Sequence, residues 1–67
     1  MFTGKVKWFN PTKGYGFIAP EDGSQDIFVH ISEVEKAGIR SLVEGDVVKY
    51  ETEDNRGKKS AINIQLV

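Results

Sequence analysis

The fold is decided by residues 13–30, which read KGYGFIAPEDGSQDIFVH. This stretch contains the run 15–19 and nearly all of the run 26–31, both of which are rich in β-branched and aromatic residues. The turn sequence PEDG lies between them at 20–23. Such runs, bounded by proline and glycine, are typical of β-strands. We therefore expect two strands joined by a turn.

Alternation along the run 26–31 separates an aliphatic face from a polar one, because successive side chains of a strand point to opposite faces. The aliphatic face would carry Ile27, Val29 and Ile31. The other face would carry Asp26, Phe28 and His30. Burying unpartnered polar groups costs several kcal/mol, so the aliphatic face is predicted to be core. Phe28 is thereby turned outward, and a large exposed ring in that position indicates a ligand.

The run 15–19 with its flanking residues is less decisive. One face would hold Lys13, Tyr15, Phe17 and Ala19, and the other Gly14, Gly16, Ile18 and Pro20. Alternation alone allows the aromatic face to be core, as such rings often are. The lysine on that face favours the outward interpretation, and inward glycines suit the tight coiling of a small barrel. If the two strands pair, their rings form one surface.

Three further β-rich runs, 4–9, 46–52 and 60–66, complete the pattern. Turn sequences lie at 10–14 and 55–57. Five short strands in 67 residues predict an all-β barrel or sandwich, folded as a single domain over residues 1–67. In the last two runs we expect two sets of side chains to face the core. The sets are Val48, Tyr50 and Thr52, and Ile62, Ile64 and Leu66.

Two segments leave questions open. Alternation in the run 4–9 puts Trp8 beside Val6, so Trp8 is either core or, if a bulge places it beside Lys7, on the surface. Residues 32–45 do not resemble a strand. There Ser32 is expected to cap one helical turn, and Ile39 and Leu42 to hold the segment against the barrel.

Charge and composition limit the classes of function. The net charge is −1, but residues 1–20 carry three lysines and no acid, whereas residues 21–67 hold six basic and ten acidic residues, or −4. This asymmetry indicates one face for an anionic partner. There is no cysteine, and His30 has no obvious nucleophile partner, so we expect no metal, cofactor or enzymatic activity. No signal peptide or membrane-spanning run is evident, and we expect a cytoplasmic monomer.

Residues 4–10 (GKVKWFN), 13–18 (KGYGFI) and 26–30 (DIFVH) together resemble the bacterial cold shock protein family. The resemblance implies a five-stranded antiparallel barrel of the oligonucleotide-binding (OB) type. It also implies binding of single-stranded RNA and DNA with low sequence specificity, and an RNA chaperone role that melts secondary structure and regulates transcription or translation. Carried over by position, it places at the ligand Lys7, Trp8, Lys13, Tyr15, Phe17, Asp26, Phe28, His30 and, in a nearby loop, Arg56.

The chain departs from the family pattern at several positions. Family members often carry aromatic residues where this chain has Ile31 and Ile39, which offer apolar contact without a π-face. Lys58 and Lys59 stand where a Gly-Pro-Gln-Ala pattern is common, and they either contact phosphates or form a solvated hairpin tip. Phe9 is a further candidate at the edge of the site. The competing hypothesis is a barrel that grips a peptide with the same rings, and it predicts little dependence of binding on salt.

Overall fold

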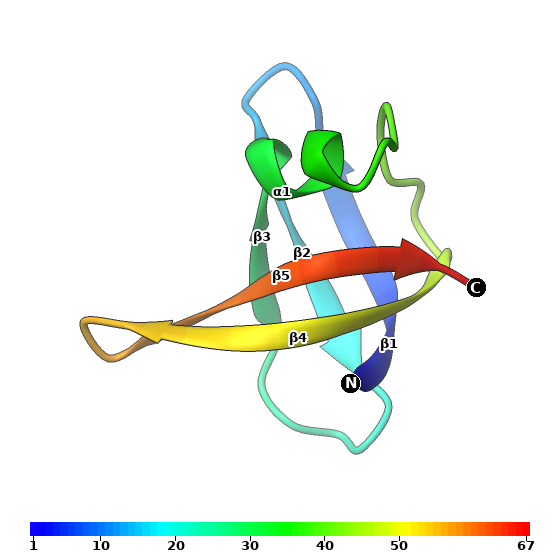
Figure 1. The fold of residues 1–67 in the computed structure, drawn as a ribbon. Coiled ribbons are helices and arrows are strands. Elements are labelled where there is room, and N and C mark those ends of the chain that lie inside the picture. Colours follow the sequence, from blue (N-terminus) through cyan, green and yellow to red (C-terminus); the bar gives the residue numbers. More distant parts are fainter.

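Five strands and one short helix make up the chain, and the computed structural model describes residues 1–67 apart from the side chain of Asn55. The elements are β1 (Phe2–Asn10), β2 (Tyr15–Pro20), β3 (Ile27–His30), α1 (Ile31–Lys36), β4 (Val47–Asn55) and β5 (Lys58–Leu66). The strands close into a barrel in the order β1-β2-β3-β5-β4, and α1 lies at one end of it (Figure 1). The predicted five-stranded barrel is confirmed.

The barrel closes through one parallel contact. The pairings β1–β2, β2–β3, β1–β4 and β4–β5 are antiparallel. The pairing of β3 with β5 is parallel, with Phe28 opposite Ser60. In this one pairing the barrel departs from the expected antiparallel arrangement. Helix α1 and the loop after it carry the chain from β3 to β4, which pairs with β1, so that β5 returns beside β3 (Figure 1).

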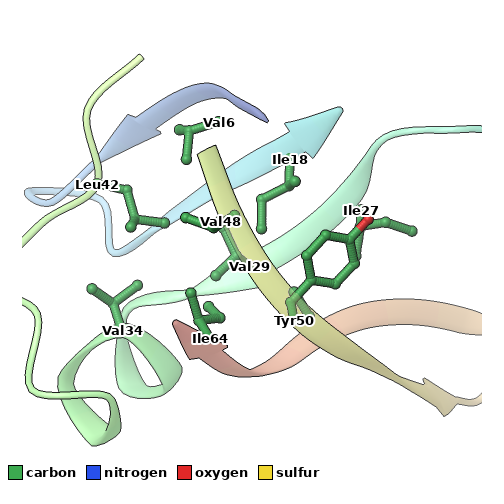
Figure 2. Close-up of a cluster of buried hydrophobic side chains, with 10 residues drawn as sticks. Val6, Ile18, Ile27, Val29, Val34, Leu42, Val48, Tyr50 and Ile64 are labelled. Atoms are coloured by element: carbon green, nitrogen blue, oxygen red, sulfur yellow. The ribbon is translucent and has the colours of Figure 1, made fainter. Parts of the chain in front are cut away.

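A small aliphatic core with one aromatic ring fills the barrel (Figure 2). Its members are Val6, Ile18, Ile27, Val29, Val34, Leu42, Val48, Tyr50, Ala61 and Ile64. Leu42 and Ile39 hold the long connection against the barrel, as predicted. Burial raises the pKa of the Tyr50 phenol. The core therefore draws residues from all five strands, from α1 and from the loop.

The predicted strand 26–31 is too long, and the predicted cap is wrong. The strand ends at His30, and Ile31 is the first residue of α1 rather than a core residue of β3. His30, not Ser32, is the N-cap, because its side chain accepts a hydrogen bond from the backbone N–H of Ser32. The Ile31 N–H donates to the carbonyl of Gly14 at 2.9 Å. These two hydrogen bonds turn the chain out of the sheet.

The face predicted for β5 is wrong in part, since Ile64 is buried as expected but Leu66 is not. Ala61 and Ile64 are buried, whereas Leu66 is 53% exposed. The pairing shifts by one residue between Lys49 and Glu51 of β4, and Asn63 has a left-handed φ of 51°. Two residues of β5 thus oppose one of β4. Such a bulge reverses the alternation of the faces.

The β4–β5 hairpin projects beyond the barrel (Figure 1). Arg56 and Gly57 form its turn and both have positive φ, at 54° and 80°. This is the geometry of a two-residue type I′ turn, which matches the twist of the flanking strands. The turn predicted at 55–57 is present.

Candidate nucleic-acid interface

Three rings predicted to face outward lie together on neighbouring strands. Tyr15 and Phe17 of β2 are half-buried, as is Phe28 of β3. Phe28 is directly opposite Phe17 in the pairing, and its ring centroid lies 5.9 Å from that of Phe17 and 5.8 Å from that of Tyr15. Ile18 and Val29, on the opposite faces, are fully buried. Alternation located the outer face correctly on β3, and alternation together with Lys13 and the inward glycines did so on β2.

A bulge in β1 brings Trp8 to the same face. The pairing runs Val6 to Ile18 and then Trp8 to Phe17, which leaves Lys7 as an extra residue. The alternation is reversed after Lys7. Trp8 is accordingly 38% exposed, and its ring lies 5.3 Å from Phe17 and 5.5 Å from Tyr15. The bulge, rather than the local sequence pattern, settles the position of Trp8.

Gly16 allows β1 to approach at this point. A Cβ atom added there would overlap the carbonyl oxygen of Trp8 and lie 2.7 Å from the Cα of Phe9. The position therefore needs a residue without a side chain. Phe9 itself packs against the core, so the structure does not bring this candidate into the ring cluster.

We call the cluster of outward rings the aromatic surface. It consists of Trp8, Tyr15, Phe17, Phe28 and His30. His30 extends it toward α1, with its ring 6.4 Å from that of Phe28. Tyr15 and Phe28 are stacked, whereas the other neighbouring rings meet tilted or edge to face, so the rings do not share one plane. The surface can hold several flat apolar groups side by side.

Charged side chains border the aromatic surface. The ammonium group of Lys7 is 2.9 Å from a carboxylate oxygen of Asp26, and both side chains are largely accessible to solvent, at 57% and 36%. Lys7 follows the buried Val6 and points outward by ordinary alternation, and the bulge places Trp8 on the same side. Lys13 is exposed in the turn before β2. An anionic chain passing over the rings would therefore meet ammonium groups from β1 and from this turn.

An open groove of about 720 Å³ joins the aromatic surface to the β4–β5 hairpin. The groove is lined by Phe17, Ser24, Gln25, Asp26, Ile27, Phe28, Asp54, Gly57, Lys58 and Lys59. Both hairpin lysines thus lie on the same groove as Phe17 and Phe28, next to the turn that holds Arg56. Sequence alone did not indicate Ser24, Gln25 or Asp54, because no local pattern connects them to the rings.

Two further candidates are the isoleucines of α1 and of the loop after it. Ile39 is half-buried against the core. Ile31 is half-buried at the start of α1, where its Cγ2 would be 3.3 Å from a Cβ added at Gly14. Ile39 thus serves the packing of the long connection, whereas Ile31 lies against the turn at Gly14. Among the described residues, no helix is long and apolar enough to cross a membrane.

Comparison with known proteins gives one consistent family. The model described as "'Cold-shock' DNA-binding domain" matches residues 2–67. A probable cold shock protein, y4cH of Sinorhizobium fredii, is 60% identical over 67 residues, covering 97% of each chain. Cold shock protein CspA of Rhizobium meliloti is 57% identical over 67 residues, again covering 97% of each. Cold shock-like protein CspC of Escherichia coli is 45% identical over 64 residues, covering 96% of this chain and 93% of CspC.

Proposed function

Because the chain belongs to the "'Cold-shock' DNA-binding domain" family and is thus a nucleic-acid-binding protein, we propose that it binds single-stranded RNA and DNA with low sequence specificity. Bases would stack on the aromatic surface, and lysines would contact the phosphates between them. The observation that carries this proposal is the position of Trp8, Tyr15, Phe17 and Phe28. Their rings are gathered on the outer face of three strands with neighbouring centroids 5.3–5.9 Å apart.

Stacking is the main source of affinity in this proposal. Every base has a π-face, and stacking on an aromatic side chain contributes about 1–3 kcal/mol per base whatever the sequence. Four rings would supply roughly 4–12 kcal/mol before the cost of ordering a flexible strand is subtracted. Micromolar to nanomolar dissociation constants follow. Hydrogen bonds that Asp26 accepts from a base edge, or that His30 makes with one, would add a modest preference among bases.

Phosphate contacts supply a smaller, salt-dependent contribution. Lys7 and Lys13 flank the rings, and Lys58 and Lys59 line the groove that continues from them. Arg56, in the hairpin turn, is the remaining cation proposed at the strand. If about three phosphates are neutralised, the slope of log K against log salt should be near −2 for a single strand.

The same binding mode accounts for chaperone activity. A duplex hides its base faces, so the protein would prefer unpaired strands and shift hairpins toward the open state by mass action. This requires binding alone, with no enzymatic step. Since the rings and lysines lie on one molecule, no second copy is needed. We therefore propose that it acts as a monomeric RNA chaperone in the cytoplasm that influences transcription or translation.

A fluorescence titration tests the proposal. Trp8 is the sole tryptophan, and a base stacked on its ring should quench its emission. We expect saturable quenching by a short pyrimidine-rich single strand, and much weaker quenching by a duplex of the same sequence. Increasing salt should weaken binding with the slope given above. Unchanged emission at tens of micromolar single strand, together with no shift in gel mobility, would overturn the proposal.

A further inference from the structure

His30 has an unusual pair of contacts at the edge of the aromatic surface. Its Nδ1 atom lies 3.1 Å from the backbone nitrogen of Ser32, which donates a hydrogen bond to it. The hydroxyl oxygen of Ser32 is 3.0 Å from the same atom. Both contacts come from one residue, and both reach the same nitrogen of the ring.

These contacts determine which ring nitrogen carries the proton. A backbone N–H can only donate, so Nδ1 must offer its lone pair, and the hydroxyl can rotate to donate to it as well. A neutral imidazole has one N–H. With Nδ1 unprotonated, that proton is on Nε2. The cap of α1 thereby fixes both the tautomer and the orientation of the His30 ring.

The Nε2–H group is directed away from the helix. The two nitrogens lie on different sides of the ring, so a ring whose Nδ1 faces Ser32 turns Nε2 away from it. His30 is exposed, and its ring is 6.4 Å from that of Phe28. A single hydrogen-bond donor is thus held beside a stacking platform.

We propose that Ser32 is a positioning residue that holds His30 as a hydrogen-bond donor toward an acceptor oxygen of the bound single strand. This rests on the proposed function and adds to it a chemical preference. The acceptor is a base carbonyl, as in uracil and thymine, or a phosphate oxygen. Ser32 itself does not touch the ligand. It acts by excluding the tautomer in which Nε2 would be an acceptor.

The tautomer can be measured directly, because His30 is the sole histidine. In a ¹⁵N spectrum of the free protein, the neutral imidazole should show a protonated Nε2 and an unprotonated Nδ1. Addition of a short oligothymidylate should shift the Nε2–H signal and leave the tautomer unchanged. A proton on Nδ1 in the folded protein would overturn the proposal.

Binding of altered oligonucleotides tests the role of the donor. One thymine at a time is replaced by difluorotoluene, which keeps the shape and stacking of the base but lacks its carbonyl acceptors. A second set replaces single phosphodiesters by formacetal linkages, which lack phosphoryl oxygens. Formacetals at phosphates contacted by lysines should weaken binding of every variant, so the informative penalty is the one that depends on His30. We expect it at one position in one set, about 2–12-fold for a base carbonyl, the value of one neutral hydrogen bond, and larger for a charged phosphate oxygen. The set in which it occurs identifies the acceptor.

Two variants assign that penalty to residues. His30→Phe keeps a ring for stacking without a donor, so the penalty at that position should vanish. Ser32→Ala should reduce the penalty by about twofold while binding of the altered oligonucleotide stays as in wild type. Equal weakening of both ligands by Ser32→Ala would mean a merely structural role. Tight binding of oligothymidylate with no His30-dependent penalty in either set would overturn this inference and leave the proposed function intact.

Discussion

Replacing Phe28 by alanine should separate binding from folding. Phe28 is the central ring of the aromatic surface, since its centroid is within 5.8–6.4 Å of the rings of Tyr15, Phe17 and His30. Removing one stacking platform should cost about 1–3 kcal/mol of binding free energy, or roughly 5–150-fold in Kd. The side chain is half-buried, so its loss should lower the free energy of unfolding by only about 1–2 kcal/mol.

Val29→Ala is the matched control. Val29 is the next residue of β3, points to the opposite face and has 0% exposure. Its truncation should lower the free energy of unfolding by about 1.5–3 kcal/mol through the lost burial and the cavity left behind. The folded molecules should nevertheless bind with the wild-type Kd, because the outer face is unchanged.

The assay is Trp8 quenching by a short single strand at low temperature, with the folded fraction of each variant taken from a urea unfolding curve. We expect a large loss of affinity in Phe28→Ala and none in Val29→Ala after correction for the folded fraction. If Phe28→Ala bound like wild type per folded molecule, the ring would be a packing residue and the reasoning from strand alternation to function would fail.

Three further substitutions address the edges of the site. Asp26→Asn should free Lys7 for phosphate, tightening binding about 2–5-fold and steepening the log-log salt slope by about 0.7. Asp22→Asn, the control, removes the same charge outside that ion pair and should do less in the same titrations. Weaker binding by Asp26→Asn would contradict this expectation and mean that the hydrogen bonds of the carboxylate to base edges outweigh the release of Lys7. Arg56→Asn should raise the melting temperature by several degrees, since asparagine favours the left-handed turn conformation, and weaken binding about twofold by loss of one exposed cation; a lower melting temperature would contradict the turn argument. Gly16→Ala should lower the free energy of unfolding by about 1–3 kcal/mol, measured in urea, because its Cβ would collide with the backbone of β1; unchanged stability would mean that β1 can move aside.

Strand alternation predicted the outer face well where polar residues accompany the rings. Asp26 and His30 on either side of Phe28 made burial of that face costly, so the outward position followed from elementary energetics. On β2 the glycines served the same purpose. They leave room for a close neighbour inside a tightly coiled barrel, and Gly16 does lie directly against the backbone of β1.

Alternation failed where a strand contains an extra residue. The bulges at Lys7 and beside Asn63 reverse the faces beyond them, and neither is encoded by the pattern of its own strand. A bulge depends on which residues lie opposite, and that information belongs to the pairing of two strands. The cap at His30 was missed for a similar reason, because the preference of Ser32 for caps was considered without the histidine two residues before it.

The two bulges have opposite effects on the division between core and surface. Without the bulge at Lys7, Trp8 would share the inner face with Val6, in a core that already holds Tyr50 as its one large ring. The bulge turns Trp8 outward and so adds it to Tyr15, Phe17, Phe28 and His30 on the aromatic surface. The bulge in β5 instead brings small Ala61 to the inside. Local departures from regular strand geometry therefore let so short a chain keep a closed aliphatic core while most of its aromatic rings stay available to a ligand.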